Sequence, residues 1–219
     1  RLAVMLSEKG SIFGDFALFA LDSRGDDRFL MTGSGPIQEW HMRWFDRSLP
    51  AEGVSVRNVT DQWMGLNVVG PRSRELLTRL TRADLGPDAF PFLAIREIEL
   101  GLGPVRAARI SLTGELGFEL WIPAMYMRGV YTRLLDAGAD LGIRNVGTLA
   151  MLSMRLEKDF GIWGREFSPD YAPSQNSMHR FVDYSKRSFI GREAALADRE
   201  AGPTKRLITL AIGATTSDA

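Results

Sequence analysis

Short apolar runs separated by polar turns dominate the start of the chain. Leu2 to Leu6 and Ile12 to Leu21 are apolar and aromatic, and the turn-forming stretch Glu8 to Gly10 lies between them. The polar stretch Asp22 to Asp27 then precedes a third run, Arg28 to Thr32. Runs of this length bounded by turn formers are typical of strands joined by hairpins. The pattern predicts an antiparallel meander.

Helical spacing replaces this pattern further along the chain. Trp40, Trp44 and Phe45 recur at helical intervals behind Pro36, which predicts a helix over about Pro36 to Arg47. Further helices are expected after Gly70-Pro71 and at Ala124 to Ala137, Val146 to Lys158 and Arg192 to Glu200. Further strands are expected at Val54 to Val59, Trp63 to Val69, Leu93 to Leu100, Val105 to Leu112, Phe118 to Ile122 and Leu207 to Ile212. Strands grouped before helices favour an α+β fold with antiparallel sheets over a doubly wound parallel sheet.

Composition places the chain among ordinary globular proteins. It has 219 residues, of which 45% are apolar and 25% charged, enough for one large or two small domains. The 27 lysines and arginines balance 27 aspartates and glutamates, so no net positive field is present to hold nucleic acid or an anionic membrane surface. No apolar window reaches the roughly 18 residues that span a bilayer. The absence of cysteine fits a reducing compartment, either bacterial cytoplasm or the mitochondrial matrix.

Several catalytic signatures are missing. Gly101-Leu102-Gly103 lacks the third glycine of a dinucleotide loop and lies between two expected strands, so a hairpin turn explains it better. His41 and His179 have neither a serine elbow nor metal-ligand spacing beside them. We expect His41 in a packed core and His179 at the surface. No flavin, nucleotide or metal site is expected within these residues.

Asp15 interrupts the apolar run GSIFGDFALFAL. A lone carboxylate in such a run is ordinarily an exposed residue on an edge strand. A desolvated aspartate that faces a pocket would instead stabilise positive charge on a bound amine. Both interpretations stay open at this point.

Glu119 occupies a strand that alternates strictly. In TGELGFELWIP, Phe118, Leu120 and Ile122 fall on one face, and Glu119 and Trp121 fall on the other. The second face is either a solvated surface or the wall of a pocket. In a pocket, a fixed carboxylate accepts two parallel hydrogen bonds from an amino-pyrimidine edge.

The stretch from Phe160 to Ser177 reads as a long loop, a common location for binding groups. Trp163 lies in it beside Gly164, and an aromatic side chain held on a glycine turn supplies a flat wall for a ring. A tryptophan that covers the edge of a core is an equally common arrangement.

Five separated motifs together resemble the folate-binding aminomethyltransferase family, meaning the glycine-cleavage T-protein and the C-terminal halves of dimethylglycine and sarcosine dehydrogenases. The motifs are GSIFGDF at 10–16, NVVGPRSRELLTRLT at 67–81, RISLTGELGFELWIP at 109–123, SMRLEKDFGIWGREF at 153–167 and FIGREAAL at 189–196. The RLEK and WG elements and the REFSPDYAP loop are similar to the dehydrogenase-associated branch. In combination, the motifs are more specific than any one of them.

The resemblance implies two lobes around a central folate pocket. Residues 1–50 together with 140–200 would form the folate-binding lobe, and residues 51–139 a ferredoxin-like lobe. Residues 203–219 would start a truncated C-terminal β-domain, and Arg1 would be a cut edge with further residues before it.

The resemblance also assigns site residues. Asp15 corresponds to the family aspartate near folate N10 and the reacting carbon, and Glu119 to the carboxylate that holds the pterin. Trp163 aligns with an aromatic position beside the pocket. Met151 stands where the T-protein has a pterin-contacting arginine, and Leu112 replaces a tyrosine usual in the family. Asp15 and Glu119 should therefore converge on one ligand in an apolar cavity.

The implied activity is tetrahydrofolate-dependent one-carbon transfer, which forms 5,10-methylenetetrahydrofolate from an N-methyl amine-derived iminium or from an aminomethyl donor. Tetrahydrofolate is the implied cofactor, and FAD is expected only in an upstream domain. The implied partners are a small-molecule amine or methylamine donor, and either a flavoprotein domain or a lipoyl carrier protein. Two alternatives are a folate-dependent demethylase and a non-catalytic folate-binding module. The resemblance implies glutamate at the position of Gln175. This departure, together with Met151 and Leu112, favours the non-catalytic module.

Overall fold

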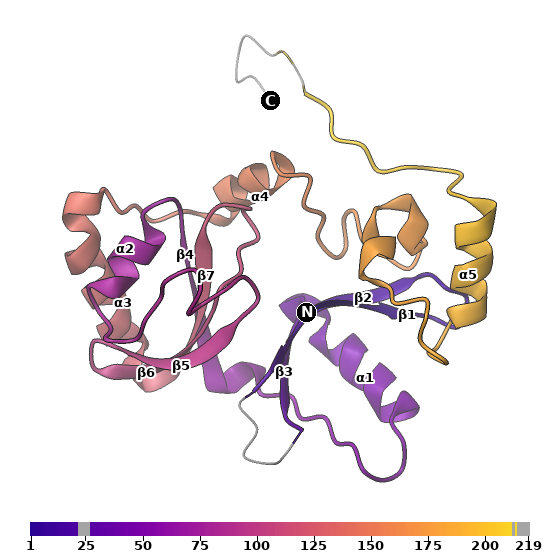
Figure 1. Ribbon diagram of the computed structural model, residues 1–219, viewed down its shortest axis with the longest axis horizontal. Helices are drawn as coiled ribbons and strands as arrows, with labels where there is room; N and C mark the ends of the chain where they lie inside the picture. The colour runs from indigo at the N-terminus through magenta and orange to yellow at the C-terminus, as the bar shows by residue number, and fades with distance from the viewer. Residues whose placement is uncertain (22–26, 212, 214–219) are drawn as a thin grey trace. The chain divides into compact units, whose positions relative to one another are not determined.

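The computed structural model describes residues 1–21, 27–211 and 213. These residues form two compact units (Figure 1): unit 1 contains Arg1–Ala3 and Phe16–Met154, and unit 2 contains Val4–Asp15 and the chain from Arg155 onward. Antiparallel sheets with packed helices make up the fold, so the predicted α+β class is confirmed. None of the described helices combines the length and the hydropathy that a membrane-spanning helix requires.

A four-stranded antiparallel sheet forms the centre of unit 1. Its strands are β4 (Trp63–Val69), β5 (Ile95–Leu100), β6 (Gly103–Ala108) and β7 (Gly117–Pro123). The strand order is β4-β7-β6-β5, which places β4 at one edge. Gly101, at a φ of 64°, lies in the tight turn between β5 and β6, as the sequence predicted for this glycine pair.

Alternation along β7 decides which face of this sheet the helices cover. Phe118, Leu120 and Ile122 are fully buried, each 0% exposed. The helices α2 (Ser73–Thr78) and α3 (Ala124–Gly138) contribute leucine and valine side chains to the same apolar cluster. Both helices lie on one side of the sheet in Figure 1. The elements of this part of unit 1 therefore run β4-α2-β5-β6-β7-α3, with β6 connected to β7 without a helix between them.

A second sheet has three strands, β1 (Leu2–Leu6), β2 (Ile12–Ala20) and β3 (Phe29–Thr32). Their order is β1-β2-β3, and β2 pairs with β3 in antiparallel register, so the predicted meander is confirmed. Phe19 of β2 packs edge-on against Trp121 of β7, with 5.8 Å between ring centroids. This contact covers part of the β7 face that the helices leave open.

The helix α1 (Gln38–Ser48) buries the histidine that the sequence placed in a core. His41 is 4% exposed and packs edge-on against Phe16 of β2, with ring centroids 4.7 Å apart. His179 is exposed, as expected.

The described 3-10 turns are η1 (Gly35–Ile37), η2 (Thr60–Gln62), η3 (Ala139–Leu141), η4 (Pro173–Gln175) and η5 (Met178–Phe181).

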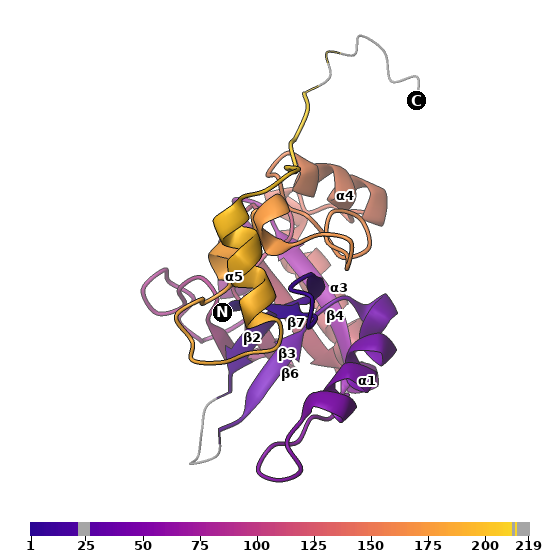
Figure 2. The same cartoon turned by 90° about the vertical axis from the view of Figure 1, so that its right-hand side faces the viewer.

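Two further helices flank the long loop. The helix α4 (Thr148–Leu156) begins in unit 1, and its last residues belong to unit 2. The helix α5 (Arg192–Ala201) packs beside the β1–β2 turn of unit 2 (Figure 2). Gly10 permits this close approach, because a Cβ atom there would lie 2.8 Å from the backbone nitrogen of Ala195.

The strand predicted at Val54 to Val59 is wrong. These residues belong to no strand, and Val54 is 56% exposed. The Asn58 side chain instead accepts a hydrogen bond from the Thr60 N–H at 2.9 Å and donates one to Gln38 at 2.9 Å. Local bonds of this kind compete with pairing, and an apolar alternation forms a strand only where a partner strand is available.

The strand predicted at Leu207 to Ile212 is also wrong over its described part, 207–211. The Leu207 N–H bonds to the carbonyl of Gln175 at 2.8 Å, and Ile208 is 68% exposed, so the segment lies along a loop and not along a sheet. Ile212, residues 214–219 and most of the polar turn at 22–27 lie outside the described residues. The predicted lobe boundaries and the truncated C-terminal β-domain stay predictions.

Candidate functional site

A cavity of about 780 Å³ lies along the outer edge of β4 in unit 1. Its walls come from β4, α2, α3, the start of α4 and the connection between the two latter helices. Leu112 and Met151 both line it, together with Leu141, Tyr131 and Thr113. Ligand pockets of small molecules typically have about 300–1,000 Å³ and mainly apolar walls. This cavity has the size and lining of a site for a small organic molecule.

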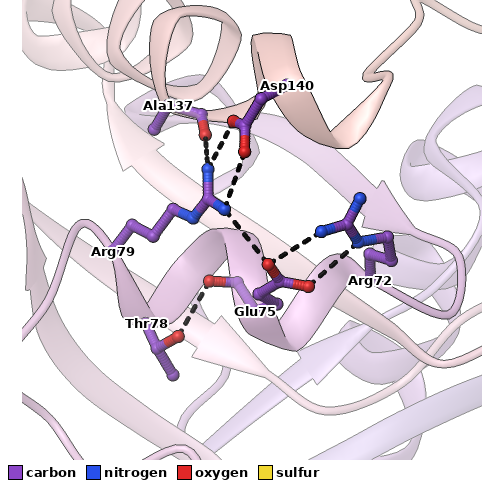
Figure 3. A network of polar contacts seen from close by, with 6 residues as sticks. All are labelled: Arg72, Glu75, Thr78, Arg79, Ala137 and Asp140. Carbon is purple, nitrogen blue, oxygen red and sulfur yellow. Dashed lines mark hydrogen bonds and ion pairs between the residues drawn. The ribbon is translucent and has the colours of Figure 1, made fainter.

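The charges that line the cavity are positive. Arg72 and Arg144 contribute to its wall, and no described aspartate or glutamate does. The Arg72 guanidinium is held by two hydrogen bonds of 2.9 Å to Glu75 (Figure 3). Arg144 is exposed and donates to the carbonyl of Ile143 at 2.8 Å. Because Glu75 offsets the charge of Arg72, the lining favours a ligand with a mainly apolar body, and Arg144 is the group of the wall that would attract a negative end. In the described part of the chain, no cluster of histidine, aspartate and glutamate is suited to a metal ion.

Glu119 lies on β7 directly opposite Asn67 of β4. Side chains of directly opposed residues share one face of a sheet, so Glu119 is a neighbour of Asn67, which lines the cavity although Glu119 itself does not. Burial raises the pKa of the Glu119 carboxyl to about 7, and no charge of the described residues offsets that effect. A desolvated carboxyl of this kind has unused capacity to accept hydrogen bonds. Glu119 therefore does not lie on a solvated strand face, which was the alternative interpretation of the sequence.

Asp15 lies on β2, the middle strand of its sheet, and not on an edge strand. It is half-buried, and burial raises the pKa of its carboxyl to about 6, while a hydrogen bond from its own backbone partly opposes the rise. At neutral pH this carboxyl is mostly ionised but poorly solvated. A nearby positive charge would therefore stabilise it strongly, and it would stabilise that charge in return.

Trp163 occupies a tight turn of unit 2. Gly164 follows it at a φ of 81°, a conformation that favours glycine, and the Gly164 N–H donates to the carbonyl of Phe167 at 2.8 Å. The tryptophan ring is partly buried against a cluster formed by Ile12, Phe167 and Met178. The Trp163 ring thus covers the edge of this small apolar cluster, and part of the ring stays exposed.

The structure brings two of the five predicted site residues into one cavity, Leu112 and Met151. Glu119 belongs to the same unit and lies one strand away from β4. Asp15 and Trp163 belong to unit 2. The convergence of Asp15 and Glu119 on one ligand stays a prediction.

Sequence reasoning missed a buried polar network at the end of α4. Arg155 is 1% exposed and forms an ion pair with Glu166, with 2.9 Å between Nη1 and Oε2. Glu157 and Lys158, with which the sequence grouped Arg155, are both exposed. The available signal was an arginine within the apolar run MLSMRL, but helical spacing alone does not show which face of a helix is covered.

Known proteins are similar to this chain over most of its length. Mitochondrial dimethylglycine dehydrogenase of Homo sapiens is 36% identical over 216 residues, which make up 97% of this chain and 24% of that protein. The aminomethyltransferase of Moorella thermoacetica is 31% identical over 201 residues, 92% of this chain and 54% of that protein. The crystal structure of the glycine cleavage system aminomethyltransferase T from Bartonella henselae shares the fold, with a TM-score of 0.79 at 24% identity over 93% of this chain and 53% of that one. The chain thus spans about a quarter to a half of these relatives.

The family comparison agrees with the separated motifs. The GCVT N-terminal domain family matches residues 1–186, a range that holds all five predicted site residues. The relatives carry the names of amine dehydrogenases and of an aminomethyltransferase, so the resemblance inferred from the motifs is confirmed. The chain belongs to the GCVT N-terminal domain family.

Proposed function

We propose that this chain binds tetrahydrofolate and transfers to it a one-carbon unit from an amine. The observation that carries the proposal is the cavity of about 780 Å³ whose wall includes both Leu112 and Met151. The names of the relatives, an aminomethyltransferase and a dimethylglycine dehydrogenase, support an amine as the source of the carbon. The product would be 5,10-methylenetetrahydrofolate.

The residues of the cavity fit this ligand. Leu112, Met151 and Leu141 supply apolar surface for the faces of a flat ring, whose polar edge would need hydrogen-bond partners in the protein. Tetrahydrofolate ends in a glutamate whose carboxylates are negative at neutral pH. Arg144, whose guanidinium donates to the carbonyl of Ile143, would attract that end, whereas Glu75 offsets the charge of Arg72.

Glu119 would hold the pterin. Its pKa is raised because burial removes water from the carboxylate and the protein does not replace that water with enough hydrogen-bond donors. An amino-pyrimidine edge would supply two parallel N–H donors. Binding of such a ligand would lower the pKa of Glu119, because hydrogen bonds to the charged form favour that form. Affinity should therefore rise with pH through about 7.

Asp15 would act on the transfer itself. With an iminium donor, the net reaction converts the iminium ion and tetrahydrofolate into the free amine, 5,10-methylenetetrahydrofolate and one proton. The carboxylate of Asp15 would stabilise positive charge on the reacting nitrogen and would be available to take the released proton. A poorly solvated carboxylate interacts more strongly with such a charge than one in bulk water.

Two variants of α4 test the binding site. Met151→Asp places a charge in the wall of the cavity, whereas Leu149→Asp changes the same helix at a side chain that is 82% exposed and outside the cavity. In calorimetry, Met151→Asp should lose at least about tenfold in tetrahydrofolate affinity, and Leu149→Asp should bind as the wild type does. Equal binding by both variants would remove the cavity from the proposal.

The donor and the partner are part of the proposal. In the dehydrogenase branch, a flavoprotein domain carrying FAD would oxidise an N-methyl amine to the iminium, and in the T-protein branch a lipoyl carrier protein would deliver an aminomethyl group. The location that we propose is a bacterial cytoplasm or the mitochondrial matrix, and the word mitochondrial in the name of the dimethylglycine dehydrogenase supports the second. Assaying the chain with each donor system separates the two branches.

A second candidate function is a folate-binding module without catalysis. Gln175 supports it, because its Oε1 accepts the Ala172 N–H at 2.9 Å and so serves a local turn at a position where the family resemblance implies a carboxylate. A module of this kind would bind tetrahydrofolate as the proposal requires but form no methylene product from either donor. Formation of that product would exclude it.

A further inference from the structure

The outer edge of β4 carries backbone groups that its sheet does not use. β4 is an edge strand and pairs with β7 alone in the described sheet. The Gly70 N–H donates to the carbonyl of Leu116 at 2.8 Å, and the two residues continue the β4–β7 register. Directly opposed residues of antiparallel strands alternate between bonded and non-bonded pairs. The N–H and C=O groups of Gly65, Asn67 and Val69 therefore point away from β7.

These outward groups lie at the cavity of unit 1. Gly65, Asn67 and Val69 all line it, and no described residue hydrogen-bonds their backbone groups. A free strand edge presents a row of alternating donors and acceptors. Peptide-like ligands form main-chain hydrogen bonds to such a row. The cavity thus has a directional polar wall beside its apolar side chains, and this wall suits a ligand that contains an amide.

Neither backbone conformation nor packing requires a glycine at position 65. Gly65 is not among the glycines with positive φ, and a Cβ atom there would meet no heavy atom within 4 Å. A glycine inside a strand weakens the strand, and it often marks a place where a ligand approaches the backbone closely. A side chain at this position would project on the same face as Asn67. Gly65 therefore leaves the β4 backbone open for a flat group.

The remaining wall limits what can pair with this edge. The connection between α3 and α4 lines the cavity from Leu141 to Thr148. The Asn145 side chain donates to the Tyr131 hydroxyl of α3 at 2.9 Å, which ties the connection to that helix. The volume of about 780 Å³ suits one small molecule, and Arg144 adds a positive charge to the wall. The site therefore fits a single extended acid and not a further sheet.

We propose that the β4 edge binds the benzoyl-glutamate half of the folate ligand, with the glutamate N–H donating to the Gly65 carbonyl, the α-carboxylate accepting the Asn67 N–H, and the aryl ring lying over Gly65. The identity of the ligand rests on the proposed function. An N-acyl amino acid presents its N–H and a carboxylate oxygen on one side, as a residue of an added parallel strand does. The bond from the Asn67 N–H is charge-assisted and hence stronger than one between neutral groups. Gly65 and Asn67 thus determine specificity for the amide and the α-carboxylate.

The first test uses p-aminobenzoylglutamate, which contains this half of the ligand and no pterin. In 1H–15N spectra of the full chain, binding of the probe should move the Asn67 amide resonance downfield and slow its hydrogen exchange. The Val68 amide points toward β7 and is the internal control, so its resonance and exchange rate should not change. Probe binding with an unchanged Asn67 amide, or no binding at millimolar probe, overturns the proposal.

Two analogues of the probe each remove one hydrogen bond. The ester analogue has oxygen in place of the N–H that meets the Gly65 carbonyl. The γ-aminobutyrate analogue lacks the α-carboxylate that meets the Asn67 N–H but keeps the other carboxylate. In the same spectra, each analogue should bind about tenfold more weakly than the probe. Equal affinity of all three compounds would show that the edge does not read the ligand and would overturn the proposal.

Gly65→Val tests where the ring lies. Valine favours strands and meets no neighbour here, so the variant should keep its fold and at least its wild-type melting temperature. Its affinity for the probe should fall at least about tenfold, because the side chain occupies the space of the ring. Met64→Val, a change at a side chain that is 45% exposed and outside the cavity wall, is the matched control and should bind as the wild type does. Wild-type affinity in a folded Gly65→Val, or in Gly65→Phe, overturns the placement of the ring.

Tetrahydrofolate itself separates the edge site from the proposed function. Slowed exchange of the Asn67 amide with the probe, together with no binding of tetrahydrofolate, would refute the proposed function and leave the edge site standing. Binding of tetrahydrofolate with an unchanged Asn67 amide would overturn the edge site and leave the proposed function standing. The same change at Asn67 with both compounds is the expected result and supports both.

Discussion

Two carboxyl groups with raised pKa values distinguish this chain at the residue scale. Burial raises the pKa of Asp15 to about 6 and that of Glu119 to about 7. At neutral pH the first is therefore mostly charged and the second is divided between its two forms. The difference matches different roles, because a charge stabiliser must be ionised before the ligand arrives, whereas a hydrogen-bond acceptor becomes fully ionised on binding.

Glu119→Gln should stabilise the protein at alkaline pH. The folded state keeps the proton of Glu119 up to about pH 7, whereas the unfolded chain releases it near the ordinary value of 4.5. The folded state thus binds more protons between these values, and stability falls as the pH rises through them. Chemical denaturation at pH 8 should show the variant more stable by about 1–3 kcal/mol, and at pH 4 the two proteins should agree.

Glu99→Gln is the matched control, since Glu99 lies exposed on β5 of the same sheet. Its denaturation curves should follow those of the wild type at both pH values. The burial of Glu119 would be disproved by a Glu119→Gln curve that also follows the wild type at pH 8. The same variant should bind tetrahydrofolate more weakly, so stability and affinity should change in opposite directions.

Asp15→Asn should slow one-carbon transfer and leave tetrahydrofolate affinity little changed. The amide keeps the shape of the side chain but carries no charge, and the loss of a preorganised electrostatic contact typically costs about a hundredfold or more in rate. The wild-type rate should rise with pH through about 6 as Asp15 ionises, and the variant should lose that step. Asp46→Asn, an exposed change on α1, should alter neither quantity. A normal rate for Asp15→Asn would remove Asp15 from the mechanism.

At the scale of elements, an exposed ion-pair network connects α2 to the end of α3. Arg79 reaches Asp140 at 2.6 Å and Glu75 at 3.1 Å, and Glu75 also bonds Arg72 (Figure 3). The neighbouring arginines hold the pKa of Glu75 and of Asp140 below their usual values. The network therefore stabilises the folded state at neutral pH and loses that effect as the pH falls through those lowered pKa values. Solvent screening keeps the effect small.

Arg79→Ala should lower the melting temperature slightly, and mainly at low ionic strength. The side chain joins two carboxylates, and about 1 M salt screens exposed charges almost completely. Thermal melts at 20 mM and 1 M sodium chloride measure the difference. Arg128→Ala changes an exposed arginine on α3 and serves as the comparison. A loss that persists in 1 M salt would mean that the Arg79 bond to the Ala137 carbonyl, and not the charge network, carries the effect.

Sequence patterns predicted the elements that pack against a partner and failed for those that do not. The strand at Trp63 to Val69 was predicted with its observed bounds, and it pairs with β7 along its whole length. Val54 to Val59 has a comparable alternation but bonds locally through Asn58. Alternation of apolar and polar residues shows that a segment is suited to a strand. The segment also needs the free edge of a sheet with which to pair, and its own sequence does not show whether such an edge is available.

At the scale of the whole molecule, candidate residues were easier to predict than their arrangement. Leu112 and Met151 were assigned through family motifs, and they line one cavity. Alternation on β7 was enough to separate Glu119 from the buried face. Arg155 and Glu166 were missed because their importance lies in burial and in the bonds they make across the loop, and neither property is visible in local sequence.

The two units differ strongly in the size of their apolar cores. Within the described residues, the main cluster of unit 1 contains thirteen buried side chains, while the cluster of unit 2 around Ile12 and Met178 contains three. Apolar burial supplies most of the stabilising free energy of a folded region, so a small cluster opens at lower cost. Unit 2, which carries Asp15 and Trp163, should therefore be the less stable part of the chain.

Native-state hydrogen exchange measures this difference directly. Amides of the turn at 160–167 should exchange at a lower opening free energy than those of β7, in proportion to the apolar surface that each region buries. Met178→Ala should lower the opening free energy within unit 2 by about 2–5 kcal/mol and leave β7 unchanged, because the lost packing belongs to the small cluster. Leu77→Ala, a change at 0% exposure in the large cluster, should instead weaken protection across β4 to β7. Equal shifts of all amides in both variants would mean that the chain opens as a single cooperative body, and the stability of the Trp163 turn would then depend on the core of unit 1.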